Sequence, residues 1–150
     1  MIRRGFLSDY FEGMAVKRLS VVETTPSRSN QHEFNSTISL HRLFGENDRR
    51  GIPTRFVWLG AEQEGISVED TISWYDARRN HPTRTEYRLY YSGNEVTELM
   101  EAGDTFFLAL QRDGSAMVII TPAGSTVQNQ LLWLFGVEEQ PQLDFAVREI

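Results

Sequence analysis

Short stretches in which hydrophobic and polar residues alternate run along most of the chain and predict many short strands. Over residues 13–23 the alternation places Met14, Val16 and Arg18 on one face of a strand. Further strands are predicted over 55–59, 71–75 and a segment ending at Tyr91, and a hairpin is predicted from 106–111 to 117–121. The turn of that hairpin is Arg112-Asp113-Gly114-Ser115.

A few short helices are predicted between the strands, two of them with a polar capping residue before the helix and a glycine after it. Their ranges run from Ser36 or Thr37 to Phe44, from Ser92 or Asn94 to Ala102, and over a short buried helix at 128–135. We expect the core to hold the bulkiest aromatic residues, namely Trp58, Trp74, Trp133, Phe106 and Phe107. The pattern favours an α+β, mostly β fold: a mixed barrel or pseudobarrel of about seven short strands with a few short helices.

Two polar segments interrupt the strands and are expected to project as arms. The first arm covers residues 24–35, and the second begins at Ala77 and reaches Pro82. After Val137 the sequence becomes acidic and polar. We therefore expect one domain over 1–137, followed at 138–150 by an acidic tail or the start of a linker.

Charge is unevenly distributed along the 150 residues, whose formal net charge is −6. Residues 1–91 have a balance of +1 and residues 92–150 a balance of −7. A basic face that attracts phosphate is therefore compatible with the low overall charge. The absence of cysteine, of a secretory signal and of a membrane-length apolar segment fits a cytoplasmic protein.

The charged run His81-Pro82-Thr83-Arg84-Thr85-Glu86-Tyr87-Arg88 is the most informative motif of the chain. Arg84, Glu86 and Arg88 alternate, so an extended backbone projects all three side chains from one face. Arginine pairs with guanine O6 and N7, and glutamate accepts from cytosine N4, so this face could read G·C pairs in a major groove. The alternative is a solvated strand face with cross-strand ion pairs.

Further candidate DNA contacts lie in the first arm and on the strand before it. Asn and Gln can pair with adenine, while His, Ser and basic residues can hold phosphates. The alternative is an ordinary polar loop and a solvated basic pair. These candidates are Lys17, Arg18, Ser20, Ser29, Asn30, Gln31, His32 and Asn35.

Catalytic, metal and cofactor sites are not expected. The three histidines are far apart in the sequence and lack nearby paired carboxylates, which argues against a metal site. The single lysine, Lys17, follows Ala15 and not an acid two positions earlier, so the Asp/Glu-x-Lys pattern of metal-dependent nucleases is absent. No glycine-rich phosphate loop is present.

The order of these motifs resembles the N-terminal effector-binding domain of EcoRII-type restriction endonucleases. Tyr10-Phe11, Lys17-Arg18-Leu19-Ser20, the Asn30-Gln31-His32 arm and the Thr83–Arg88 run carry the resemblance, which spans most of residues 8–136. The chain departs from that pattern at Pro82 and Tyr87, where basic residues are expected, and in a first arm without a glycine-rich stretch.

The resemblance implies a DNA-binding pseudobarrel, similar to the DNA-binding domains of certain plant transcription factors, that grips double-stranded DNA between two arms. It implies a 5′-CC(A/T)GG target that this domain reads without cutting, in a prokaryotic restriction enzyme whose separate C-terminal nuclease domain is the partner. No membrane or small-molecule substrate is implied. Carried onto this chain, the DNA-binding set comprises the residues named above together with Arg79, His81, Thr83 and Tyr87.

Three alternatives remain open at this point. One is a nuclease complete in this chain, and the second is a protein-binding regulatory module that docks through the acidic C-terminal third. The third is a reader of methylated cytosine, for which Tyr87, Tyr90 and Tyr91 are candidate aromatic contacts.

Overall fold

The structure is a computed structural model that describes residues 10–19, 33–34, 38–60, 65–78, 80, 82–83, 87–135 and 146–149. Within these ranges the fold is α+β and mostly β, as the alternating pattern predicts. The strands are β1 (Phe11–Arg18), β2 (Glu33–Phe34), β3 (Arg49–Trp58), β4 (Ile66–Asp76), β5 (Tyr87–Tyr91), β6 (Thr105–Gln111), β7 (Ala116–Thr121) and β8 (Ala146–Glu149). The helices are α4 (Ile38–Phe44), α5 (Glu95–Leu99) and α6 (Thr126–Phe135).

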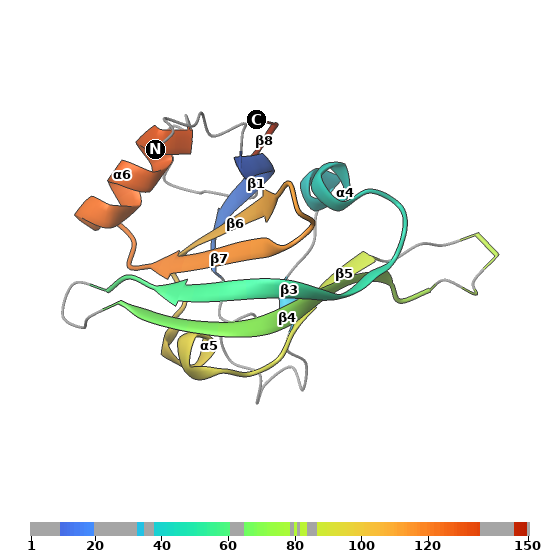
Figure 1. Cartoon of the computed structure of the whole chain (residues 1–150), viewed down its shortest axis with the longest axis horizontal. Coiled ribbons are helices and arrows are strands. Elements are labelled where there is room, and N and C mark those ends of the chain that lie inside the picture. Colours follow the sequence, from blue (N-terminus) through green and yellow to red (C-terminus); the bar gives the residue numbers. More distant parts are fainter. Residues whose placement is uncertain are drawn as a thin grey trace.

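The strands form one curled sheet in the order β2-β5-β4-β3-β7-β6-β1-β8 (Figure 1). Neighbouring strands are antiparallel except β3 and β7, which are parallel. The predicted hairpin is confirmed, since β6 and β7 pair from Thr105↔Thr121 to Leu110↔Ala116. The connection between the parallel strands β3 and β7 passes through β4, β5, α5 and β6.

The inner face of the sheet carries the larger core. Alternate residues of every central strand point into it, including Phe56, Trp74, Leu89, Phe106 and Val118. Helices α4 and α5 cover this core with their own apolar side chains, namely Leu40, Phe44 and Val96. A fully buried aromatic or aliphatic side chain of this kind stabilises the fold by about 1.5–3 kcal/mol.

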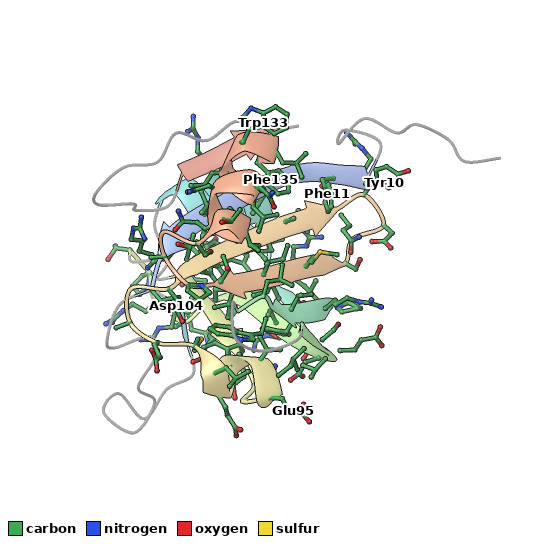
Figure 2. All side chains as sticks on the ribbon, turned by 90° about the vertical axis from the view of Figure 1, so that its left-hand side faces the viewer. Tyr10, Phe11, Glu95, Asp104, Trp133 and Phe135 are labelled. Atoms are coloured by element: carbon green, nitrogen blue, oxygen red, sulfur yellow. The ribbon has the colours of Figure 1, made fainter. Side chains whose placement is uncertain are left out.

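A second, smaller core lies between α6 and the opposite face of β1 and β6. Met14, Val16, Phe107 and Ala109 contribute from the strands, and Leu132 contributes from the helix. Figure 2 shows Phe135 directed toward Phe11, and their ring centroids are 6.0 Å apart in an edge-to-face arrangement. Helix α6 therefore covers one end of the outer face.

The described helices leave the outer face of β3, β4 and β5 open. Along β3 the residues alternate between exposed and buried from Gly51 to Phe56, and β4 alternates between intermediate or exposed and buried positions over its second half. Figure 1 shows β3 and β4 crossing the middle of the molecule, with α6 to one side of them. This part of the sheet, which no described helix covers, is called the open outer face below.

Several boundaries differ from the sequence-based expectation. Both β3 and β4 are longer than the predicted 55–59 and 71–75, because the two strands pair with each other beyond those ranges, into more polar sequence. Arg49 to Gly51 also belong to β3, although no strand is predicted there. The register of β3 shifts there, and Gly51 adopts a φ of 65°, so this bulge favours glycine.

The prediction that 128–135 is a buried helix is wrong for one side of α6. Trp133 is 82% exposed, and Figure 2 shows it on the outer side of the helix. Only Gln128 and Leu132 are fully buried in this helix, which runs from Thr126 to Phe135. A helix that packs on a sheet face buries only one stripe of its surface, so Trp133 lies opposite that stripe.

The segment predicted as a tail or linker returns to the sheet. Residues 146–149 form β8, which pairs with β1 from Gly13↔Glu149 to Val16↔Ala146. Residues 136–145 and 150 lie outside the described residues. The division at residue 137 stays a prediction.

The predicted cap of α5 is confirmed, and it generates a stability prediction. The Asn94 side-chain oxygen accepts from the backbone N–H groups of Val96 and Thr97, each at 3.0 Å. We expect Asn94→Ala to lower the free energy of unfolding by about 1 kcal/mol in urea titration, because two helix donors lose their acceptor. Asn94→Ser keeps an oxygen at this position and should recover most of that loss; equal losses in the two variants would contradict the capping role.

Candidate nucleic-acid interface

Five of the predicted DNA-contacting residues fall within the described ranges: Lys17, Arg18, Thr83, Tyr87 and Arg88. Predictions for the others stay predictions. The residues outside the described ranges are Ser20, Ser29, Asn30, Gln31, His32, Asn35, Arg79, His81, Arg84 and Glu86.

Arg88 projects from the open outer face of the sheet. On β5 the buried residues are Leu89 and Tyr91, so Arg88 and Tyr90 occupy the alternate, outer positions. Arg88 lies directly across from Tyr75 on β4, and directly opposed residues share one face. The last residue of the predicted Arg-x-Glu-x-Arg ridge is therefore on the open outer face, where it is half-buried.

The outer face next to Arg88 combines aromatic rings with arginines. The guanidinium carbon of Arg50 lies 4.6 Å from the centre of the Tyr75 ring, in cation–π contact. Tyr90 is 40% exposed and pairs with Ser73 on β4. Further along β3, Arg55 forms an ion pair with Glu69 at 3.0 Å. Sequence analysis did not identify Arg50, because no strand was expected at its position. The outward direction of Tyr75 could have been found, because its neighbour Trp74 points inward.

Tyr87 faces the opposite way from Arg88. Its ring stacks on Trp74 with the ring centroids 5.1 Å apart, and the ring of His41 meets it edge-on at 4.5 Å. The Tyr87 hydroxyl donates to the backbone carbonyl of Glu46 at 2.6 Å. These contacts give Tyr87 a structural role at the base of the second arm.

The turn between α4 and β3 is fastened to β4 by further bonds. The indole N–H of Trp74 donates to the Gly45 carbonyl at 2.9 Å. The Asp48 carboxylate accepts from the Asp76 backbone N–H at 3.1 Å, where β4 ends. The last described strand residues before the second arm and the first after it are thus both held by the α4–β3 turn.

Lys17 and Arg18 leave β1 on opposite faces. Lys17 shares the inner face with Ala15 and Leu19 and is 7% exposed. Arg18 shares the face of Met14 and Val16, and its guanidinium is 3.5 Å from the side-chain oxygen of Gln128 on α6. The prediction that both contact DNA phosphates stays untested, and the burial of Lys17 leaves little of its side chain accessible.

Gln128 is a buried polar residue that sequence reasoning did not single out. Besides Arg18, its side-chain oxygen accepts from the Thr105 hydroxyl at 2.7 Å and from the Gly124 N–H at 3.0 Å. A buried amide that is this fully bonded fixes the start of α6 against β1 and β6. A polar residue on the apolar stripe of the predicted helix was the signal that could have identified it.

Both arms reach β5: residues 33–34, at the end of the predicted first arm, form β2 and pair with it, and the second arm joins β4 to it. The described chain before the first arm ends at Leu19, whose N–H donates to the Asp104 carbonyl at 2.8 Å. It resumes at β2, where Glu33 pairs with Tyr90. The second arm joins β4 to β5, which pair at Asp76↔Tyr87. Glu33 thus lies opposite Tyr90, which is three residues along β5 from Tyr87 at the base of the second arm, a separation of about 10 Å.

The three tyrosines considered as an aromatic cage do not converge. Tyr91 is fully buried in the inner core, and Tyr87 packs against that core. Tyr90 occupies the outer face. A cage around a flipped base needs rings that line one pocket, so these three residues cannot form one together.

The carboxyl of Asp104, beside the point at which β1 meets the first arm, leads to a prediction about how stability depends on pH. Burial raises the pKa of its carboxyl from the ordinary 3.8; its bond from the Glu101 N–H opposes that shift, and the charge of Glu101 adds to it. Between the pKa of this carboxyl in the unfolded chain and its pKa in the folded state, the folded state therefore keeps a proton that the unfolded chain releases. The contribution of this carboxyl to stability falls as pH rises through that range. Asp104→Asn keeps an acceptor without charge, so its stability relative to wild type should increase between about pH 3 and pH 7 in urea titrations.

The control for this measurement is Asp113 in the β6–β7 turn. The side-chain and backbone hydrogen bonds from Ser115 lower the pKa of the Asp113 carboxyl below 3.8. Asp113→Asn should therefore show the opposite trend and lose stability relative to wild type as pH rises. Parallel trends in the two variants would contradict the assignment for Asp104.

A second prediction tests whether the Tyr87 hydroxyl anchors the α4–β3 turn. We expect Tyr87→Phe to lower the free energy of unfolding by about 0.5–1.5 kcal/mol, because the Glu46 carbonyl loses its donor. Tyr90→Phe removes an exposed hydroxyl from the same strand and should change stability by less than about 0.5 kcal/mol. Equal stabilities of the two variants in urea would refute the anchoring role.

Neither the described residues nor the comparisons with known proteins assign a further function to the chain. Among the described residues, no three His, Cys, Asp or Glu side chains come together in a way that could hold a metal ion. None of the helices in the described ranges has the length and apolar composition needed to cross a bilayer. No protein-family model matches the chain, and no curated protein matches it either.

Proposed function

We propose that this chain is a sequence-specific, double-stranded DNA-binding domain of the kind found at the N-terminus of EcoRII-type restriction endonucleases. The observation that supports this proposal best is the position of Arg88. It lies on the sheet face that no described helix covers, next to the base of the second arm and across from Tyr75. A face of this kind can approach a major groove without rearrangement of the sheet.

In this proposal the charged run reads bases and the rest of the fold positions it. Arg84 and Arg88 donate to guanine O6 and N7, and Glu86 accepts from cytosine N4 or orients the two arginines. Ser29, Asn30, Gln31 and His32 contact bases or phosphates from the first arm. The target is a CC(A/T)GG-like duplex, and cleavage belongs to a separate nuclease domain of the same protein.

The arrangement of strands is compatible with the pseudobarrel that this proposal requires. A sheet in the order β2-β5-β4-β3-β7-β6-β1-β8 curls around the inner core, with α4 and α5 covering that core. Strands and packed aromatic residues give the arms a rigid base, and rigid bases lower the entropic cost of ordering an arm on DNA. The bonds from Tyr87, Trp74 and Asp76 to the α4–β3 turn supply that rigidity at the second arm.

Fluorescence anisotropy at a stated, near-physiological salt concentration tests the proposal directly. One duplex carries a central CCTGG, and the other has the same composition in scrambled order. A preference of roughly a hundredfold or more for CCTGG would support specific readout. Weak and equal binding would favour a protein-binding regulatory module instead, and nicking of a plasmid with magnesium would favour a complete nuclease.

Arg88→Ala tests the base-reading role. Loss of one bidentate contact should cost about 1–3 kcal/mol on the CCTGG duplex and much less on the scrambled one, so the preference should narrow by roughly 10-fold to 100-fold. Arg112→Ala is the matched control, because Arg112 is an exposed arginine in the β6–β7 turn, three strands away from β5 in the sheet. If Arg88→Ala keeps the wild-type preference, the assignment of the reading arm is wrong.

A further inference from the structure

A shallow hollow opens on the outer face at the base of the second arm. Arg50 at the start of β3, Tyr75 near the end of β4 and the loop residues Arg78 and Asn80 line it. Figure 1 shows the end of the sheet where the chain from α4 enters β3, which is the end that carries Arg50. Neither Arg50 nor Tyr75 is part of the sequence-predicted DNA-binding set.

Arg50 is held in place while most of its side chain stays exposed. Its guanidinium lies over the Tyr75 ring, with the guanidinium carbon 4.6 Å from the ring centre. The Arg50 side chain is still 65% exposed, and it forms a long ion pair of 3.8 Å with Asp48. A guanidinium carries five N–H donors in one plane, so a group stacked on a ring can still bind an oxyanion through its edge.

The backbone beneath Arg50 fixes the direction of this side chain. The β3 bulge at Gly51 breaks the register between Arg49 and Ile52, and the Gly51 N–H donates to the Ser73 hydroxyl at 3.0 Å. This bond ties the bulge to β4 two residues from Tyr75. The arginine is therefore preorganised, which reduces the entropy lost when it binds a ligand.

The carboxylates near the hollow are engaged in structural hydrogen bonds. Asp76 is buried, and its side chain accepts from the Arg78 backbone N–H at 2.9 Å. Asp48 accepts from the Asp76 N–H at 3.1 Å. Two arginines, Arg50 and Arg78, are among the described residues that line the hollow, and Arg88 lies across from Tyr75 on the next strand. Among the described residues named here, the arginines outnumber the acids by one, and guanidinium groups suit a phosphate.

We infer that this hollow binds a phosphate group, and that its source is the backbone of the DNA that the charged run reads. The second half of this inference rests on the proposed function. The hollow lies one strand away from Arg88, so a phosphate bound there fixes the register of the duplex while Arg88 reaches a base edge. Contacts of this kind position the protein and carry no sequence information.

Arg50→Gln and its matched control Arg55→Gln test the inference. Both arginines are exposed on β3, with 65% and 54% of their side chains accessible, and both variants remove one charge. We expect Arg50→Gln to weaken binding to CCTGG and scrambled duplexes alike, by roughly tenfold, and to lower the salt slope by about 0.9. Arg55→Gln should leave affinity and slope near wild type. Thermal melts of both variants confirm that each is folded.

The wild-type result separates the two levels of the proposal. If the wild type prefers CCTGG but Arg50→Gln matches Arg55→Gln in affinity and salt slope, the assignment of the hollow as a phosphate site is wrong and the proposed function stands. If the wild type binds neither duplex, the proposed function fails and the backbone assignment fails with it. A loss in Arg50→Gln that is confined to CCTGG would mean that Arg50 reads a base, which also overturns the inference.

Chemically altered duplexes and inorganic phosphate distinguish the source of the phosphate. In duplexes with one neutral methylphosphonate at successive positions, the wild type should lose roughly tenfold at one position, and Arg50→Gln should lose nothing further there. Inorganic phosphate, titrated at constant ionic strength and followed by the Arg50 side-chain NMR signal, should bind only at millimolar concentrations or above. Saturation at micromolar phosphate would assign the hollow to a free phosphate ligand and overturn the backbone assignment.

Discussion

The packing of Trp74 is the constraint on which the described fold and its candidate interface both depend. Its ring is fully buried, stacks on Phe44 and Tyr87, and donates through its indole N–H to the Gly45 carbonyl. One side chain thus joins the end of α4, the following turn and two strands of the sheet. Removing such an aromatic from a core costs about 3–5 kcal/mol, a large part of the stability of a small domain.

This packing also decides which residues reach solvent. Because Trp74 and Tyr87 point inward, their neighbours Tyr75 and Arg88 must point outward, and the register Tyr75↔Arg88 places them side by side. Arg50 then completes a row across β3, β4 and β5 by lying on the Tyr75 ring. The outer row therefore exists because the inner aromatic cluster fixes the pleat of each strand. A shift of β5 by one residue would turn Tyr87 to the outer face and Arg88 to the inner face. Both the outer row and the inner aromatic cluster would then be lost.

The sequence predicts the parts of this fold that depend on local alternation and on capping. The β6–β7 hairpin, the end of α4 at Phe44 and the cap at Asn94 are confirmed, because each is determined by residues close together in the chain. The outward position of Arg88 follows from the alternation that predicts a ridge of Arg84, Glu86 and Arg88. Local patterns of this kind carry most of the information that a single sequence provides.

The parts that the sequence does not predict depend on which elements meet in three dimensions. The hydrophobic character of Trp133 does not show that α6 packs through Leu132 and leaves Trp133 exposed. The strand at 146–149 is specified by pairing with β1, far away in sequence. Lys17 and Arg18 are adjacent and basic, yet the pleat directs one into the inner face and the other toward Gln128. Composition cannot reveal such differences, because they arise from tertiary packing.

The row of Arg50, Tyr75 and Arg88 suggests why affinity and specificity can be separated on one face. Neighbouring strands are about 4.8 Å apart, so the backbones that carry the two arginines are separated by about 10 Å, close to the width of a major groove. Tyr75 stands between them and holds Arg50 by cation–π contact, while Arg88 lies across from it on β5. With a spacing of this size, one guanidinium can meet the phosphates that border a groove while the other enters it. In the proposed complex, the base contact would act from a position that the phosphate contact has already set, and Tyr75 would link the two without touching either ligand.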